Sequence, residues 1–302
     1  MATMLPVDHH VHSERGPYTF EWLDAFVNRA RECLISQLGM VEHSTQFRSL
    51  DWHMQLEIAP DTDPNGVAQR DWFERHRNRE ALAHYMEFVE NARTCYAKVA
   101  FGLEVDWTSS GNSIRVIQGF DWDFVIGSVH FVNGWAADNP QLAGIWAKLS
   151  EDEVYTSYFA LLHNLIDSHR FDILGHLDVL KMVRPYDLAR HRATLTRLAD
   201  AIADVGITVE VNTAYSYRHG LRDEFCPSHP VLSLLAERNV PFTISSDAHV
   251  PEHVGLHLDK ALKVLRGLGV KSIRRFRRRM GEEISYRRLA VNRAFPESLS
   301  YT

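Results

Sequence analysis

Residues 5–14 are LPVDHHVHSE, a short apolar run that ends in closely spaced histidines. Side chains alternate between two faces in an extended segment, so Asp8, His10 and His12 share one face. Two imidazoles on one side of a strand can bind a single cation, because imidazole is the commonest metal ligand among side chains. An ordinary strand end with exposed histidines would show the same pattern. The residues at the ends of the other strands must therefore distinguish this interpretation from a metal site.

Further apolar runs alternate with segments of helical period, a pattern typical of parallel strands joined by helices. The predicted strands span 5–10, 37–41, 98–105, 124–129, 173–176, 208–211 and 242–246. The predicted helices span 21–34, 72–96, 151–168, 187–205 and 231–238. This order predicts an α/β fold, either a barrel of seven strand–helix units or a closely related open sheet.

Most of the predicted strands end in a histidine or an acidic residue, as the first one does. In barrels the active site is built at the C-terminal ends of several strands at once, and a random excess of histidine would not follow that rule. Two or three cations would use so many ligands, and nitrogen and oxygen donors without thiolate suit zinc, iron or manganese. The eight candidate metal ligands are His10, His12, His43, Glu104, His130, His176, Asp247 and His249.

The bulk composition excludes several classes of protein. The chain has 302 residues, 45% hydrophobic content and three widely spaced cysteines, which predicts one soluble domain, 1–302, without a disulfide framework. A net charge of −6 argues against a general nucleic-acid binder. Without a membrane-length apolar stretch or a secretory signal, we expect a cytoplasmic protein with no membrane partner.

Two segments stand apart from the regular pattern. Residues 51–69, with two prolines and the tripeptide PNG, predict a long surface loop inserted after the second strand. The basic run KSIRRFRRR at 271–279 predicts the solvated face of a late helix, with a phosphate-recruiting patch as the alternative. The oligomeric state is left open by the sequence.

The ordered strand-end motifs DHHVH, EH, GLEVD and SDAH resemble those of the polymerase and histidinol phosphatase (PHP) family. The segments IGSVHFVNGW, ILGHLDVLK and EVNTA are similar to those of the stand-alone histidinol-phosphate phosphatases in that family. The resemblance runs from Val7 to about Gly269. It implies a distorted barrel of seven strands and seven helices, a (β/α)7 barrel, with its metal site at the C-terminal ends of the strands.

The resemblance also implies how the metals are held. A first metal would take His10, His12, Glu104 and Asp247, and a second would take Glu104, His130 and His176. A third would take His43 and His249 together with a histidine at the position where this chain has Tyr18. Glu14 is an alternative oxygen ligand for that third metal, so two or three divalent ions are expected.

Other residues near these motifs have expected roles that differ in strength. Glu104, His130 and Asp247 are the expected catalytic residues, and Lys181 and Arg218 match phosphate-binding positions of the family. Taken alone, Lys181 and Arg218 could each be an ordinary exposed charged side chain. Arg15 is a third and weaker candidate for phosphate binding. Asp8 and Asp178 are expected to orient His10 or His176, and Glu42 and Glu210 are expected to be structural carboxylates or general acids. Trp135 and Asp138 are expected to line the pocket. His53 and His219 are two further histidines whose positions need to be checked.

These features together favour hydrolysis of a small phosphate monoester by in-line attack of a metal-activated hydroxide. L-histidinol phosphate is the substrate that the resemblance implies. Another small phosphate ester, a cyclic diester or a nucleotide is the alternative, and a non-catalytic metal-binding module is a weaker one. An amidohydrolase-type barrel is disfavoured, because the corresponding strand ends have no lysine to carry a carbamate.

Overall fold

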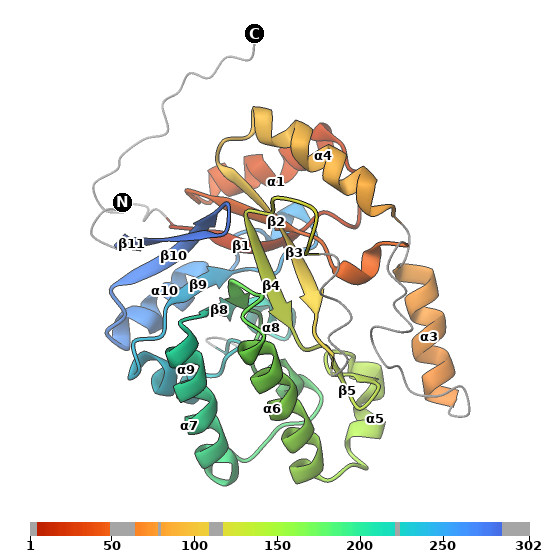
Figure 1. Cartoon of the computed structure of the whole chain (residues 1–302), viewed down its shortest axis with the longest axis vertical. Coiled ribbons are helices and arrows are strands. Elements are labelled where there is room, and N and C mark those ends of the chain that lie inside the picture. The colour runs from red at the N-terminus through yellow and green to blue at the C-terminus, as the bar shows by residue number, and fades with distance from the viewer. Residues whose placement is uncertain (1–4, 49–63, 78–79, 109–116, 221–223, 286–302) are drawn as a thin grey trace.

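The computed structural model describes residues 5–48, 64–77, 80–108, 117–220 and 224–285 (Figure 1). Seven parallel strands form one sheet in the order β1-β2-β3-β4-β7-β8-β9. These strands are β1 (Asp8–His12), β2 (Leu38–Val41), β3 (Val99–Asp106), β4 (Phe124–Ser128), β7 (Ile173–Leu174), β8 (Thr208–Asn212) and β9 (Phe242–Ser245). All seven predicted strands are present within a few residues of the expected bounds, and the predicted (β/α)7 architecture is confirmed.

The two edge strands approach each other, so the sheet is a nearly closed barrel. Val11 of β1 bridges to Ala248 after β9, and the His12 amide donates to the Ala248 carbonyl at 2.7 Å. The buried Asp8 carboxylate reinforces this seam, because it accepts from the Ser246 and Gly255 amides at 2.8 and 3.0 Å. The first and last strands are therefore joined by side-chain as well as backbone hydrogen bonds.

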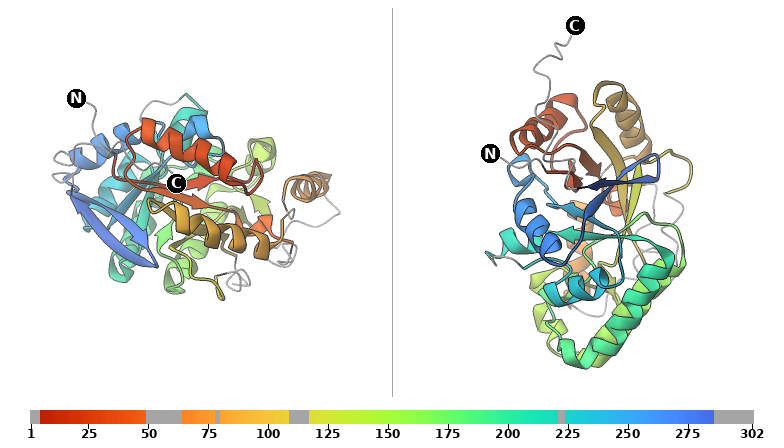
Figure 2. Two further views of the ribbon diagram at one scale, coloured as in Figure 1. Left: turned by 90° about the horizontal axis from the view of Figure 1, so that it is seen from above. Right: turned by 90° about the vertical axis from the view of Figure 1, so that its left-hand side faces the viewer.

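Helices surround the barrel on the outside (Figure 2). The longer ones are α1 (Phe20–Glu32), α3 (Pro64–His76), α4 (Leu82–Cys95), α6 (Glu151–Asp167), α7 (Leu188–Val205), α9 (His229–Ala236) and α10 (Leu258–Gly267). The α7 helix begins and ends as its sequence indicates: Asp187 caps it and Gly206, at φ 72°, closes it in the left-handed conformation. No helix in the described parts of the chain combines the length and apolarity needed to cross a bilayer.

The segment before β3 differs from the prediction in two ways. Within the predicted loop 51–69, the residues from Pro64 onward form the start of α3, since proline is well suited to the first turn of a helix; residues 51–63 lie outside the described chain. The predicted helix 72–96 is two helices, α3 and α4. Between them the Glu80 backbone pairs with that of Gln46 and Arg48, at 3.1 and 2.9 Å, and this pairing interrupts helical hydrogen bonding.

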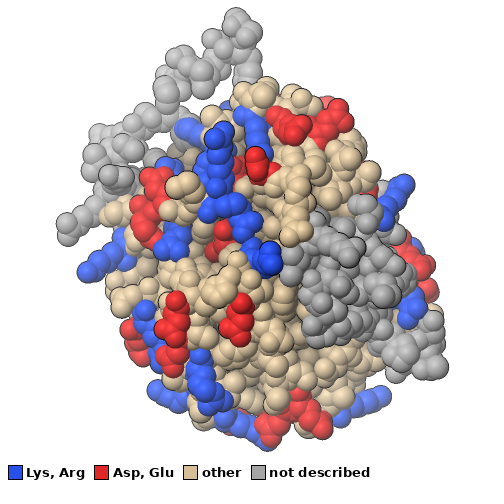
Figure 3. All heavy atoms as spheres, viewed as in Figure 1, with Lys and Arg blue, Asp and Glu red and all other residues tan. Residues whose placement is uncertain are grey.

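The basic run 271–279 is not part of a helix, so that prediction is wrong. It forms β10 (Ser272–Arg277), which pairs antiparallel with β11 (Met280–Ser285). Ile273 and Phe276 are three residues apart, so in an extended strand their side chains lie on opposite faces, and they join two different apolar clusters. Its arginines pair with acidic neighbours such as Glu282 and Glu283, and Figure 3 shows basic and acidic side chains intermixed over one face.

The hairpin covers the barrel interior with one aromatic side chain. Phe276 is buried and clusters with Val41, Ala100, Phe124, Ile126 and Ile173. Its ring centroid lies 6.0 Å from that of His9, whose own nitrogens bond to Thr243 and Gln37 at 3.0 and 2.9 Å. His9 is thus a core histidine with satisfied hydrogen bonds.

We expect Phe276→Ala to lower the free energy of unfolding by about 3–5 kcal/mol, because it removes a buried aromatic ring and leaves a cavity. Urea unfolding followed by circular dichroism measures this change. Met280→Ala in the same hairpin is the control, since Met280 is 75% exposed and its loss should cost less than about 0.5 kcal/mol. Equal effects of the two substitutions would contradict the sealing role of Phe276.

Candidate metal centre

A single buried carboxylate, Glu104 of β3, lies at the centre of the histidine cluster. Its oxygens are 2.9 Å from His43 Nδ1 and 2.9 Å from His176 Nε2. The Ser128 hydroxyl donates to the same carboxylate at 2.7 Å. Ring nitrogens of three more histidines lie at 3.2 to 3.5 Å, those of His10, His12 and His130. The structure therefore brings together the predicted ligands of several strands.

The remaining two predicted ligands, Asp247 and His249, follow β9 on the same side. Asp247 adopts a left-handed conformation with φ 52°, which Asp tolerates better than most residues. Its carboxylate lies 3.7 Å from His12 Nε2 and 3.6 Å from His249 Nδ1. The His12 and His249 rings stack at 4.3 Å. All eight predicted metal ligands thus converge on one site.

Three groups among these residues have donor atoms close enough to bind one ion each. They are His10, His12 and Asp247; His12, His43 and His249; and His43, Glu104 and His130. A fourth group combines His12 with Glu14 and Glu42. The groups share members, as expected when one ligand bridges neighbouring ions. Their donors are nitrogen and oxygen alone, which suits zinc, iron or manganese.

Buried polar atoms without partners test whether metals fit this site. Both ring nitrogens of His12, the Nε2 atom of His10 and the Oε2 atom of Glu104 are buried and make no hydrogen bond. Buried polar atoms are nearly always paired, because leaving one unpaired costs about 1–3 kcal/mol. His10 Nε2 and His12 Nε2 lie 3.2 and 3.5 Å from Glu104 Oε2, so bound cations would account for these three atoms, and the residues fit a metal centre.

The protonation states in the cluster follow from its burial and charge. Burial and the neighbouring His43 and His249 hold the pKa of His12 well below its usual value, so His12 is a neutral donor. Burial opposes ionisation of Glu104, but His10 and His43 outweigh it and keep the pKa of Glu104 well below its usual range. A neutral imidazole beside an ionised carboxylate is the ligand combination that a divalent cation requires.

Carboxylates behind the cluster orient two of the histidines. Glu210 of β8 contacts His10 Nδ1 at 2.7 Å, and Asp106 of β3 contacts His130 Nδ1 at 2.6 Å. Such partners fix the ring tautomer and aim the other nitrogen at the metal. The roles expected for Asp8 and Asp178 are wrong: Asp8 holds the barrel seam, and Asp178 bonds to Lys181 Nζ at 3.0 Å.

Tyr18 and Glu14, the two residues considered for the third metal site, lie in different surroundings. The Tyr18 ring packs against Tyr85 and Phe88, with centroids 5.1 and 5.7 Å away. The Glu14 carboxylate lies 3.6 Å from His249 Nε2 and forms an ion pair with Arg77. The alternative oxygen ligand is therefore placed at the histidine cluster, whereas Tyr18 belongs to an aromatic core.

The three expected phosphate-binding cations occupy different environments. Arg218, in α8 (Ala214–Arg218), donates to the Asp247 carbonyl at 2.6 Å and lines the cavity over the metal centre. Lys181 is buried, and its ammonium bonds to Asp178 and the Phe225 carbonyl. Arg15 is exposed. Only Arg218 of these three lines a described cavity beside the metal ligands.

Other candidates from the sequence are also placed. Glu42 accepts from the Ser13 amide at 3.1 Å and belongs to the group with His12 and Glu14. The His219 ring lies 5.2 Å from the Tyr215 ring at an interplanar angle of 52°, and His53 lies outside the described residues. Sequence reasoning missed Arg77 and the orienting role of Asp106. Asp106 was detectable, because it follows Glu104 by two positions on the same face of a strand.

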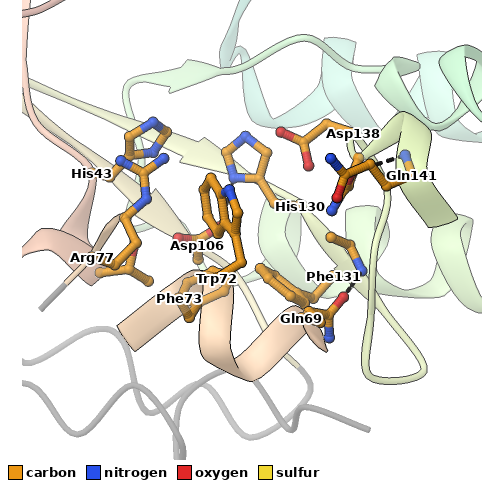
Figure 4. Close-up of a pocket in the computed structure, with 13 residues that line it drawn as sticks. His43, Gln69, Trp72, Phe73, Arg77, Asp106, His130, Phe131, Asp138 and Gln141 are labelled. Carbon is orange, nitrogen blue, oxygen red and sulfur yellow. Dashed lines mark hydrogen bonds and ion pairs between the residues drawn. The ribbon is translucent and has the colours of Figure 1, made fainter. Parts of the chain in front are cut away.

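Two adjoining cavities open over the cluster. The central cavity, of about 100 Å³, is bounded by Glu104, His176, Asp247 and Arg218 among others. The side cavity, of about 240 Å³, extends from His43 and His130 toward α3 (Figure 4). His43, Arg77, His130 and Asp138 line both cavities. Asp138 is thus a pocket residue, as predicted, whereas Trp135 lines neither cavity.

A family model described as "PHP domain" matches residues 8–214, more than half of the chain. The chain belongs to the PHP family. The matched region includes the β1, β2, β3 and β4 ends that carry His10, His12, His43, Glu104 and His130. The PHP assignment suggested by the strand-end motifs is confirmed.

Two curated proteins and one solved structure are similar to this PHP chain. A curated relative from Deinococcus radiodurans, named "Probable histidinol-phosphatase", is 28% identical over 88% of this chain and 95% of its own. One of the same name from Clostridium acetobutylicum is 25% identical over 58% of this chain and 70% of its own. A solved structure with a similar fold is that of histidinol phosphate phosphatase from Lactococcus lactis, complexed with zinc, L-histidinol and phosphate. It superposes with a TM-score of 0.70 at 18% sequence identity. The match covers 93% of this chain and 100% of the Lactococcus lactis chain.

We expect Glu104→Gln to reduce kcat by at least about a thousandfold, because the amide cannot balance the charge of neighbouring cations. Phosphate release and metal analysis of the purified variant measure the effect. His229→Ala is the control, since His229 is exposed at the start of α9 and should leave activity unchanged. Normal turnover in Glu104→Gln would rule out Glu104 as the shared ligand.

Asp106→Asn should weaken metal binding about 10- to 100-fold while the fold is retained, because His130 loses its carboxylate partner. Competition with a chromogenic chelator reports the metal affinity without any need for substrate. An unchanged affinity would mean that Asp106 does not orient a metal ligand.

Proposed function

We propose that this PHP protein is a metal-dependent phosphatase that hydrolyses a small phosphate monoester, L-histidinol phosphate, to the alcohol and inorganic phosphate. The observation that carries the proposal is the buried Glu104 carboxylate with nitrogens of five histidines within 3.5 Å. The names of the relatives support the substrate, and zinc in the Lactococcus lactis structure supports the metal.

The proposed metal ligands are those that the resemblance to the PHP family implies, with Glu14 added. His10, His12, Glu104 and Asp247 would hold one ion, and Glu104, His130 and His176 a second. His43, His249 and Glu14 would hold a third, in which the Glu14 carboxylate takes the place of a histidine. Bound divalent ions supply a nucleophile from water near neutral pH and neutralise the phosphoryl oxygens.

The protein side chains around the ions have separate tasks in this proposal. Arg218 lies at the edge of the central cavity, where its guanidinium can bind phosphoryl oxygens in a bidentate manner. Glu210 and Asp106 keep His10 and His130 in fixed orientations. The small central cavity, of about 100 Å³, can accommodate a phosphoryl group beside the ions. Lys181 and Arg15 remain candidate phosphate ligands from the sequence.

Phosphate release from a panel of phosphomonoesters, diesters and nucleotides tests the proposal on metal-analysed protein. We expect L-histidinol phosphate to be the best substrate. Chelation should reduce kcat by about a thousandfold or more, since the metals supply several kcal/mol of barrier reduction, and zinc, iron or manganese added separately should restore it. Rapid turnover of another ester without hydrolysis of L-histidinol phosphate would reject the substrate, and purified protein without bound metal would reject the class.

A further inference from the structure

Asn212, the last residue of β8, places a buried amide between two carboxylates of the metal centre. The residue is 2% exposed. Its amide nitrogen donates to Asp247 Oδ2 at 3.2 Å and to Glu210 Oε2 at 3.3 Å. Because a side-chain amide has two N–H groups, each carboxylate can receive one of them. The amide therefore fixes how the two carboxylates lie relative to each other.

The bond from Asn212 leaves the second oxygen of Asp247 for the metal centre. Asp247 Oδ1 lies 3.7 Å from His12 Nε2 and 3.6 Å from His249 Nδ1, whereas Oδ2 accepts from the amide. Carboxylates that bind metals are usually hydrogen-bonded in this way. Asn212 thus orients the proposed metal ligand Asp247.

Glu210 extends the same constraint to two histidines. Its Oε2 atom accepts from Asn212 and also from the His176 backbone amide, the latter at 2.8 Å. Its Oε1 atom contacts His10 Nδ1 at 2.7 Å. The amide of Asn212 therefore lies behind proposed ligands of both the first and the second ion.

The amide oxygen of Asn212 has a different task, since it fixes the start of α8. It accepts from the Ala214 backbone amide at 2.9 Å. The α8 helix has five residues, and so short a helix depends on outside contacts because helix nucleation is costly. Arg218 ends this helix, about 6 Å along its axis from Ala214 at 1.5 Å per residue. The position of Arg218 therefore depends on how the start of α8 is held.

Arg218 returns to Asp247 and closes a ring of contacts. Its guanidinium donates to the Asp247 carbonyl at 2.6 Å and lies 3.5 Å from Asp247 Oδ1. Asn212 thus contacts Asp247 directly and reaches Arg218 through the start of α8. A change at Asn212 should be felt both at the metals and at the cation beside the phosphate site.

We propose that Asn212 is a positioning residue that holds the metal ligand Asp247 and the phosphate-binding Arg218 in a fixed arrangement. This inference rests on the proposed phosphatase function, in which both of those residues act, and deepens it. The amide nitrogen serves the metal side and the amide oxygen serves α8. Two small substitutions can separate these tasks.

Asn212→Ala and Asn212→Ser form a matched pair that differs by one hydroxyl group. Both remove the donor to Asp247 and Glu210, so both should lower metal affinity about 10- to 100-fold in competition with a chromogenic chelator. Asn164→Ser, at an exposed position of α6, is the control and should leave metal affinity unchanged. Unchanged metal affinity in folded Asn212→Ser, verified by circular dichroism, would overturn the role at Asp247.

Binding of inorganic phosphate to the metal-saturated protein, measured by calorimetry, tests the role at α8. Asn212→Ala should weaken phosphate binding about tenfold, the range expected for loss of one hydrogen bond. Asn212→Ser should bind phosphate more tightly than Asn212→Ala, because a serine hydroxyl can accept from the amide two residues ahead. Equal phosphate affinities of the two variants would overturn this role.

A double-mutant cycle shows whether the effect passes through Arg218. In an Arg218→Met background, Asn212→Ala should cause little further loss of phosphate affinity, because the residue that it positions is absent. A full additional loss would mean that Asn212 acts on phosphate without Arg218 and would overturn the proposal. If wild type binds metals and inorganic phosphate but does not hydrolyse L-histidinol phosphate, the proposed function fails while the role of Asn212 stands.

Discussion

A carboxylate buried at 1% exposure, Glu104, sets the main constraint on this structure. Removing a charge from water is costly unless positive or hydrogen-bonding groups surround it. The compensating groups come from β1, the ends of β2 and β4, and the segment after β7. All of these strands lie within two positions of β3 in the sheet order, so their C-terminal ends can meet around one carboxylate.

The strand ends were predictable because a local signal marked each of them. A short apolar run followed by histidine or a carboxylate identifies a strand and its functional end together, so His10, His43, Glu104 and Asp247 could be assigned to one site. The carboxylate that orients each histidine was harder to predict from the sequence. Glu210 bonds to His10 across 200 residues of sequence, whereas Asp8, only two residues away, turns to the barrel seam.

The features that escaped prediction depend on tertiary contacts. The break between α3 and α4 arises from backbone pairing of Glu80 with the chain after β2, which the helical period of 72–96 does not reveal. In the basic hairpin, Arg278 and Arg279 both adopt positive φ values, and their amides bond to Asp123. Arginine is uncommon in such a turn, so the usual Asn-Gly or Asp-Gly signal was missing.

The seam between β1 and β9 also bears on how the protein is made. Ser246 and Asp8, which bond across it, are 238 residues apart in the chain. During synthesis the first strand leaves the ribosome long before its last partner exists, and its histidines have no enclosed site until then. Long-range pairing of this kind slows folding and prolongs the exposure of apolar strands. The order of translation therefore places closure of the barrel, and completion of the cluster by Asp247 and His249, after synthesis of most of the polypeptide.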